Sequence, residues 1–337
     1  MHYLITGHTG FKGAWLTLML KNLGHTVSGV ALEPLPNSLF ARANVGKELL
    51  FDFRQDIIDS HSLADVFQQI DPNVVIHMAA QPLVLESYRK PLETFQVNVM
   101  GTLNVLEATR KLRNLKATLV ITTDKVYKNL DYSKPYIETD NLGGSDPYSA
   151  SKAAADIATE SWSKSFSESP IAIARAGNVI GGGDFAENRL IPELVSSYSK
   201  GLKPKLRNPK SIRPWQHVLD CLNGYLKLVE SQIEHGTSGA WNFGPNESVS
   251  QNVAALVGEV AMQYGFGSDY WDLESENLFD EHETLHINST KSRRELDWSE
   301  KYDFATSIKK TIDWYQNIEE GKIDVFTRHQ VEDFLKN

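Results

Sequence analysis

Apolar and polar residues alternate in a regular order along the first half of the chain. Short apolar runs predict β-strands over residues 3–6, 26–32, 49–53, 74–79, 117–123 and 171–176. Between these runs, apolar residues recur at helical spacing and predict helices over residues 11–23, 63–70, 93–112 and 147–165. Strands separated by helices pair in parallel, so we expect an α/β fold built on a doubly wound parallel sheet.

The order changes after about residue 177, where stretches rich in Gly, Pro and Asn follow one another. We interpret this part as a smaller C-terminal substrate-binding region. Within it, residues 239–243 are predicted to return to the sheet as a further strand. Residues 290–296 and 304–315 are predicted to be helices.

The amino-acid composition limits the kinds of partner and compartment that we expect for the protein. The 337 residues include 34 Lys and Arg against 43 Asp and Glu, and the net charge of −9 disfavours nucleic acid or an anionic membrane as partner. The single cysteine, Cys221, excludes an internal disulfide and is expected to be a small buried residue in a reducing compartment. The opening MHYLITGH has no charged signal region, and no apolar stretch approaches the ~20 residues of a membrane span, so we expect a cytoplasmic protein.

A glycine-rich loop, GHTGFKG, lies between the first predicted strand and the first predicted helix. Its glycines would let the backbone approach a pyrophosphate, and the helix N-terminus offers unpaired N–H groups. In this strand–turn–helix context the loop indicates a dinucleotide site in a Rossmann-type fold. The residues that would form this site are Gly7, Thr9, Gly10, Phe11, Lys12 and Gly13.

The end of the second predicted strand bears on which dinucleotide is bound. Ala31 and Leu32 occupy the place where an acid would hold the adenosine ribose, and Glu33 follows. No arginine is near in the sequence to receive a 2′-phosphate, so NAD is favoured over NADP.

Tyr148 and Lys152 are candidate catalytic residues in the stretch DPYSASK. Tyr148 is the one tyrosine with a lysine four residues on, and this spacing puts both side chains on one helix face. An ammonium group and a nicotinamide ring beside the phenol would lower its pKa, which predicts a general base.

Asp124 and Lys125 follow directly on the apolar run ATLVI. A lone Asp-Lys pair in this position is most often a solvated strand end. The alternative is a catalytic pair at the carboxyl end of a parallel strand.

Several stretches resemble known families. The G-x-x-G-x-x-G loop and the set Thr123, Tyr148 and Lys152 resemble the extended short-chain dehydrogenase/reductase superfamily. The resemblance to its CDP-glucose 4,6-dehydratases is carried by GHTGFKGAWL, HMAAQPLV, ETFQVNVMGT, LGGSDPYSASKAAAD, RAGNVIGGGDFAENRLIP and IRPWQHVLD. It implies NAD as cofactor, with further contacts from Asp56, Ile57, Ala79, Ala80, Gln81 and Asn98.

This resemblance also implies a reaction, the NAD-dependent 4,6-dehydration of CDP-glucose. Tyr148 would remove the 4-OH proton with Thr123 bonded to the same hydroxyl, and Asp124 would protonate the departing 6-OH. Lys125 would remove the C5 proton or stabilise the enolate. The alternatives are a dehydratase acting on a dTDP-, GDP- or C5-inverted UDP-sugar, a UDP-sugar 4-epimerase, and a non-enzymatic NAD-sensing regulator.

The region between residues 194 and 219 has six Lys and Arg residues and no Asp or Glu. An acidic protein that binds a diphosphate needs such a local excess of cations. By resemblance, the diphosphate would be held by Asn178, Arg189, Arg207 and Arg213, with Leu190, His217 and Trp215 as neighbours of the nucleotide. For Trp215, packing in the core is an equally good interpretation.

Two further expectations concern the domains of the chain and its oligomeric state. Residues 1–176, with a returning segment near residues 212–245, would form the NAD-binding domain, and residues 177–337 would mainly bind the nucleotide sugar. The predicted helices 93–112 and 147–165 resemble those through which this superfamily forms homodimers.

The sequence HETLH at residues 282–286 formally matches a zinc-binding motif. That motif requires a helix that brings both histidines to one metal, whereas this copy lies in an acidic stretch without an apolar helical face. We therefore expect no metal site.

Overall fold

The computed structural model describes residues 1–129, 134–186, 188–246, 251–267, 270–274, 285–318 and 322–336. Its centre is a seven-stranded sheet in the order β11-β6-β5-β4-β1-β2-β3, with every pairing parallel. These strands are β1 (His2–Thr6), β2 (Thr26–Ala31), β3 (Asp52–Arg54), β4 (Val74–His77), β5 (Ala117–Ile121), β6 (Ile171–Ala176) and β11 (Gly239–Phe243). The predicted α/β fold with a doubly wound parallel sheet is confirmed, and so is the return of residues 239–243 to the sheet.

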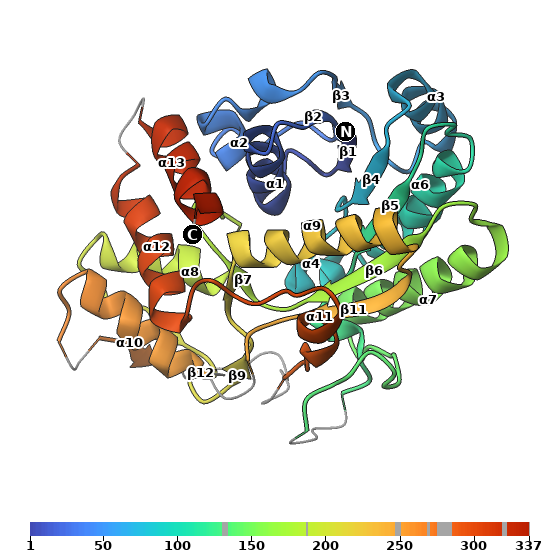
Figure 1. Cartoon of the computed structure of the whole chain (residues 1–337). Coiled ribbons are helices and arrows are strands. Elements are labelled where there is room, and N and C mark those ends of the chain that lie inside the picture. Colours follow the sequence, from blue (N-terminus) through green and yellow to red (C-terminus); the bar gives the residue numbers. More distant parts are fainter. Residues whose placement is uncertain are drawn as a thin grey trace.

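Helices connect the strands and build the C-terminal part (Figure 1). In the first part they are α1 (Phe11–Asn22), α2 (Leu39–Arg42), α3 (Ser60–Ile70), α4 (Val84–Arg89), α5 (Pro91–Phe95), α6 (Gly101–Thr109) and α7 (Pro147–Phe166). In the second part they are α8 (Leu190–Tyr198), α9 (Val218–His235), α10 (Val253–Gln263), α11 (Thr290–Glu295), α12 (Phe304–Gln316) and α13 (Ile323–Lys336). Single turns are η1 (Val45–Glu48), η2 (Gln96–Met100) and η3 (Asp124–Val126).

Short strands of two residues each lie outside the central sheet. They are β7 (Val179–Ile180), β8 (Lys205–Leu206), β9 (Ile212–Arg213), β10 (Gln216–His217), β12 (Gln251–Asn252) and β13 (Asp272–Leu273). They pair as β10 with β7, β12 with β9 and β13 with β8, and these pairs connect segments that follow β6.

The central sheet is covered by helices on both faces because its strands are apolar on both sides. In β1, Ile5 packs into the cluster that includes α1 and α9, whereas Leu4 packs into the cluster that includes α3 and α6. Successive residues of a strand point to opposite faces, so a run of buried residues such as β1 needs a helix layer on each side. Cys221, on α9, is fully buried as predicted.

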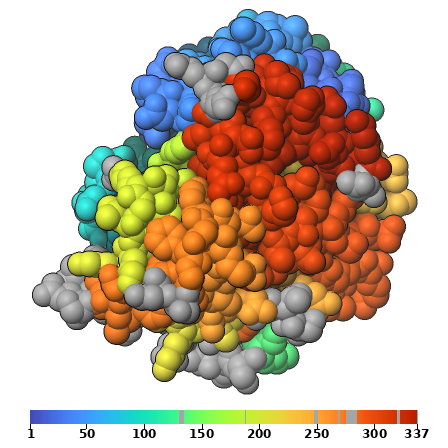
Figure 2. All heavy atoms as spheres, turned by 90° about the vertical axis from the view of Figure 1, so that its left-hand side faces the viewer, coloured from blue at the N-terminus to red at the C-terminus, as the bar shows by residue number. Residues whose placement is uncertain are grey.

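The second half contains more helix than the sequence analysis predicted. Helix α9 connects β10 to β11 and packs against β5 and β6. It is visible as the long yellow helix at the centre of Figure 1. Helices α10, α12 and α13 form one continuous outer face, shown in orange and red in Figure 2. Among the described residues, no helix is both long and apolar enough to cross a membrane.

Two predicted elements of the first half differ from the structure. The predicted strand 49–53 is reduced to β3, because η1 ends at Glu48 and Leu49 and Leu50 belong to the connection. The predicted helix 93–112 begins at Pro91, ends at Thr109 and contains the π-helical turn η2. Proline is favoured in the first turn of a helix, which explains the earlier start.

The order of the strands fixes where a ligand can bind. Strand β1 lies between β2 and β4, so the chain leaves β1 in one direction and later returns on its other side. At such a switch point the connections diverge and leave a crevice at the carboxyl ends of the strands. The loops after β1, β4, β5 and β6 all meet there.

Candidate active site

A large cavity opens at the carboxyl ends of the central strands. Its volume is about 1370 Å³, and it is lined by the loops after β1, β4, β5 and β6 together with segments around α8 and β8–β9. A pocket for a single drug-sized ligand has ~300–1,000 Å³, so this cavity has room for two ligands end to end.

The glycine-rich loop forms one end of the cavity. Gly7 has a left-handed φ of 78°, and a Cβ atom on it would come within 2.7 Å of the backbone nitrogen of Ala79. A Cβ on Gly13 would come within 2.4 Å of the carbonyl oxygen of Gly7. No side chain caps the N-terminus of α1, so its N–H groups remain available to an anion. The residues of this loop that line the cavity are Gly7, Thr9, Gly10, Phe11, Lys12 and Gly13.

Lys12 extends from this loop toward α9. Its Nζ atom donates a hydrogen bond of 3.2 Å to the hydroxyl oxygen of Tyr225, and burial lowers the pKa of Lys12. The ammonium group therefore lies inside the protein, between the cofactor loop and the rest of the cavity.

Contacts at the ends of β2 and β3 contradict the expectation that no arginine is near to receive a 2′-phosphate. Arg54 does lie beside Glu33, with 3.2 Å between Nε and Oε2, and it also pairs with Asp52. Two carboxylates thus already neutralise this guanidinium, and a 2′-phosphate would have to displace them. Glu33 itself is exposed and does not line the cavity, whereas Asp56 and Ile57 do.

Behind the loop after β4, Gln81 and Asn98 support the cavity wall without lining it. The backbone N–H of Gln81 donates to Asn98 Oδ1 at 2.8 Å, and Asn98 Nδ2 donates to the carbonyl of Gln81 and to Ser151 Oγ. Asn98 is almost fully buried. The two residues connect the loop to α7, while Ala79 and Ala80 reach the cavity.

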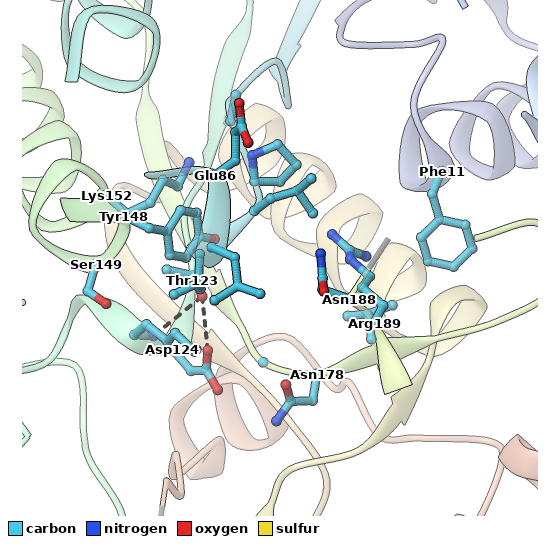
Figure 3. Close-up of a pocket in the computed structure, with 18 of the residues that line it drawn as sticks. Phe11, Glu86, Thr123, Asp124, Tyr148, Ser149, Lys152, Asn178, Asn188 and Arg189 are labelled. Carbon is cyan, nitrogen blue, oxygen red and sulfur yellow. Dashed lines mark hydrogen bonds between the residues drawn. The ribbon is translucent and has the colours of Figure 1, made fainter. Parts of the chain in front are cut away.

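Tyr148 and Lys152 face the cavity from the first turns of α7 (Figure 3). The expectation of a lowered phenol pKa included a nicotinamide ring beside Tyr148 and stays a prediction. Burial raises the pKa of Tyr148 to about 12, although its hydrogen bond with Thr123 acts in the opposite direction. Lys152 Nζ instead donates to the carbonyl oxygen of Ile121 at 2.8 Å. Burial and the nearby Lys12 lower the pKa of Lys152 to about 8.

Thr123 caps the turn η3, and Thr123 and Asp124 lie directly below Tyr148 in Figure 3. Lys125 belongs to the same turn and lines the cavity. Asp124 is 3% exposed, so the interpretation of a solvated strand end is wrong for this residue. Thr123 Oγ1 donates to Asp124 Oδ1 at 2.9 Å, whereas the buried Asp124 Oδ2 has no hydrogen-bond partner among the described residues. Burial raises the pKa of Asp124, against the opposing charges of Lys125 and Arg213.

The far end of the cavity is cationic. Asn178, Arg189 and Leu190 line it from the segments after β6. Arg189 is held by Asp184, with 2.8 Å between Nη1 and Oδ2, and Figure 3 shows Arg189 beside Asn188 on the side of Phe11. Arg207 and Arg213 line the same region from β8–β9 and their surroundings.

Trp215 and His217, which are close in sequence, differ in whether they reach the cavity. Trp215 lines the cavity, and its buried Nε1 atom has no hydrogen-bond partner within the described ranges. His217 is fully buried away from the cavity, where it caps the N-terminus of α9 and packs edge-on against Tyr302. We therefore do not retain His217 as a substrate-binding candidate. Sequence spacing gave no sign of this difference in depth.

Other polar residues of the cavity were missed from the sequence. Asp184 lies five residues before Arg189 and orients it, and Glu86 of α4 faces the cavity near Tyr148 (Figure 3). No periodic pattern marked either of them. Residues 282–284 of the HETLH motif lie outside the described residues.

Comparison with known proteins identifies the family. A protein-family model described as GDP-mannose 4,6 dehydratase matches residues 4–311. The chain belongs to this nucleotide-sugar 4,6-dehydratase family. A CDP-glucose 4,6-dehydratase of Salmonella typhimurium is 36% identical over 98% of this chain and 95% of that protein.

Solved structures agree with the fold of this family. The structure titled dTDP-glucose 4,6-dehydratase from Bacillus anthracis in complex with NAD has a TM-score of 0.81 at 24% identity, covering 95% of this chain and 98% of that one. A UDP-glucose 4-epimerase of Thermotoga maritima, solved with UDP-glucose, has a TM-score of 0.82 at 22% identity, covering 94% and 99%. Dehydratases and epimerases therefore share this architecture, and fold alone does not separate them.

Proposed function

We propose that the protein catalyses the NAD-dependent 4,6-dehydration of a nucleotide diphosphate hexose, most specifically of CDP-glucose to CDP-4-keto-6-deoxyglucose. The observation that carries this proposal is the buried Asp124, whose raised pKa favours a protonated carboxyl beside Thr123 and Tyr148. A dehydratase needs an acid at this place to expel the 6-hydroxyl group, whereas a 4-epimerase does not. The relationship to the Salmonella CDP-glucose enzyme supports the choice of nucleotide.

The residues present fit NAD. The glycines of residues 7–13 leave a cradle that side chains would fill, and the uncapped N-terminus of α1 would receive the pyrophosphate. Asp56 and Ile57 would contact the adenosine, and Ala79, Ala80 and Lys152 would lie toward the nicotinamide. When bound, NAD would accept the hydride from C4, return it to C6 after water has left, and supply a local positive charge. Gln81 and Asn98 would support the site from behind.

Tyr148 and Thr123 would act on the 4-hydroxyl group of the sugar. Tyr148 takes the proton of this hydroxyl, and Thr123 orients it by hydrogen bonding. A phenol with a pKa of about 12 is a poor base at neutral pH, so Tyr148 works only where positive charge from Lys152 and the bound cofactor lowers that value. Lys152 lies four residues after Tyr148 on α7, a spacing that puts both side chains on one helix face.

Asp124 and Lys125 would act after C4 has become a ketone, because the ketone acidifies the proton on C5. Asp124 in its protonated form donates to the departing 6-hydroxyl group, and its Oδ2 atom is the buried oxygen without a partner among the described residues. Lys125, which lines the cavity beside it, either removes the C5 proton or stabilises the enolate with its charge. Both roles require Lys125 for elimination and not for C4 oxidation.

The cationic end of the cavity would hold the nucleotide diphosphate. Arginine binds phosphate oxygens through a planar fork, and Arg189, Arg207 and Arg213 all line this end. Asn178 and Leu190 would contact the same group. Trp215, whose Nε1 has no partner among the described residues, would lie near the base. Residues 1–176 with the returning segment near 212–245 would thus bind NAD, and residues 177–337 would mainly bind the nucleotide sugar.

We also propose a homodimer in the cytoplasm. Large apolar side chains are exposed on α4–α6 and on α7, which pack against each other. They are Tyr88, Leu92, Phe95, Met100, Ile157 and Phe166. Exposed apolar surface of this kind is typical of a protein interface. Light scattering should show a dimer that Ile157→Glu dissociates, whereas Val325→Glu, on the exposed face of α13, should leave it intact; a monomeric wild-type protein would contradict this assembly.

Mass spectrometry tests the proposed function. The protein with added NAD is incubated with CDP-glucose, dTDP-glucose, UDP-glucose and GDP-mannose. We expect a product lighter by one water molecule, formed most rapidly from CDP-glucose. A product of unchanged mass would instead indicate an epimerase, and no reaction with any substrate would favour a binding protein.

A further inference from the structure

A buried ion pair lies directly behind the turn that carries Thr123, Asp124 and Lys125. Arg175 of β6 and Asp156 of α7 form a two-pronged contact, with 2.7 Å from Nη2 to Oδ1 and 2.9 Å from Nε to Oδ2. Their side chains are 3% and 0% exposed. Neither residue is among the candidates of the sequence analysis.

The ion pair is bonded to both ends of the turn. Before it, Thr122 Oγ1 donates to Asp156 Oδ2 at 3.0 Å. After it, the Tyr127 hydroxyl oxygen accepts from Arg175 Nη1 at 3.0 Å. Residues 122 and 127 are thus joined through Asp156 and Arg175 into a closed ring of contacts, with residues 123–126 between the two anchor points.

The Tyr127 anchor is itself fixed. Its hydroxyl group donates to Asn242 Oδ1 of β11 at 2.7 Å, and the Arg175 guanidinium lies over its ring at 5.0 Å. Asn242 Nδ2 in turn donates to the carbonyl oxygens of Tyr136 and Asn288. Strands β5, β6 and β11, which lie side by side in Figure 1, and helix α7 therefore all hold this one segment.

Stability alone does not account for such an arrangement. Taking two charges out of water costs as much as their attraction returns, and apolar residues of equal volume often stabilise a core as well. What a buried, fully bonded pair supplies is a fixed geometry, because a guanidinium fork admits few orientations. The geometry fixed here is that of the turn η3.

We infer that Asp156 and Arg175, with Tyr127 and Thr122 as their two arms, are positioning residues that hold the catalytic turn for the elimination step. The Tyr127 arm follows Lys125 by two residues and Asp124 by three, and the Thr122 arm directly precedes Thr123. Loss of the Tyr127 hydroxyl group should therefore disturb elimination more than C4 oxidation. This consequence for catalysis rests on the proposed function, whereas the consequence for the structure of the turn does not.

Hydrogen–deuterium exchange of the NAD-bound protein tests the structural part. Tyr127→Phe removes only the anchoring hydroxyl group, and exchange should rise in a peptide covering residues 122–127. Tyr136→Phe is the matched control, because Tyr136 stacks on Tyr127 at 5.2 Å while its hydroxyl group donates to Asn129, which lies outside that peptide. Equal exchange in the wild type and Tyr127→Phe, or an equal rise in both variants, would overturn the inference.

Single-turnover kinetics with CDP-glucose test the catalytic part. In Tyr127→Phe, reduced nicotinamide should form at a nearly normal rate, whereas product formation and C5 exchange with heavy water should fall by about tenfold to 100-fold. An equal loss in both steps would indicate a merely structural role and contradict the inference. If the wild type itself reacts with no nucleotide sugar, the proposed function has failed, and the exchange experiment still decides whether the turn is positioned by this pair.

Arg175→Lys provides a second variant of the same network. A lysine keeps the charge beside Asp156 but cannot also reach Tyr127 through a fork, so it should reproduce the kinetic defect of Tyr127→Phe at a normal affinity for CDP, measured by calorimetry. If Arg175→Lys behaved as the wild type does in both steps, the fork would not position the turn.

Discussion

The carboxyl group of Asp124 packs against the backbone of Gly177, which follows β6. A Cβ atom on Gly177 would come within 2.2 Å of Asp124 Oδ2 and 2.8 Å of Pro214 Cγ. Glycine at this position therefore provides the space in which the carboxyl group of the proposed acid lies.

Gly177→Ala should displace the Asp124 carboxyl group and slow elimination. A misplacement of about 1 Å can cost 10²-fold in rate, so we expect a loss of about that size in product formation. C4 oxidation, which Tyr148 serves, should be less affected. Gly267→Ala is the matched control, because a Cβ atom there meets no described residue within 4 Å. Normal product formation by Gly177→Ala would show that the carboxyl position does not matter.

The two half-reactions should respond to pH in opposite directions. Burial raises the pKa of Asp124, and its proposed role requires the protonated form. Elimination should therefore slow as pH rises through this pKa, while C4 oxidation, which needs the deprotonated Tyr148, should accelerate. Stopped-flow absorbance of reduced nicotinamide and rapid-quench analysis of product would separate the two. If Lys125 is the C5 base, a rising limb precedes this decline, so an elimination rate that never falls at high pH would contradict Asp124 as the acid.

Tyr148→Phe keeps the ring but removes the group that accepts the 4-hydroxyl proton. Removal of a general base typically costs 10²–10⁴-fold, so reduction of the nicotinamide should fall by about that factor. Binding of CDP-glucose, measured by calorimetry, should persist because the phosphate-binding arginines are unchanged. Near-normal hydride transfer in this variant would refute the role of Tyr148.

Lys125→Met should separate oxidation from elimination. The variant should still reduce NAD in the presence of substrate, because C4 oxidation precedes the step that Lys125 serves. Reduced nicotinamide and a 4-keto sugar should accumulate, and C5 exchange with heavy water should fall. Normal turnover would mean that Lys125 is only a solvated residue at the end of a strand.

Much of this site could be predicted because it depends on patterns between residues that are close in sequence. The alternation of strands and helices predicted the sheet, and the spacing of Tyr148 and Lys152 on one helix brought both to the cavity. The contact between Arg54 and Glu33 could also have been predicted. Arg54 ends β3, and Glu33 follows two residues after the end of β2, so the meeting of the carboxyl ends of these parallel neighbours brings them together.

Other features depend on tertiary contacts that no spacing reveals. The pKa of Tyr148 is raised because the phenol is buried, which is a property of the folded chain. The hydrogen bond from Lys152 to the carbonyl oxygen of Ile121 is a tertiary contact of the same kind. His217 and Trp215 are two residues apart, yet only Trp215 reaches the cavity. Helix α9 was not predicted, although its sequence does show the helical pattern. Apolar residues recur there at helical spacing, at Leu219, Leu222, Leu226 and Val229.

Transfer of a labelled hydrogen within the substrate tests the central claim most directly. The NAD-loaded protein is incubated with CDP-glucose that carries deuterium at C4, and the product is examined by mass spectrometry and NMR. We predict a product that has lost one water molecule and carries the deuterium at C6, because the hydrogen removed from C4 returns to the same sugar. A product of unchanged mass, or a dehydrated product without deuterium at C6, would contradict an internal NAD-dependent 4,6-dehydration.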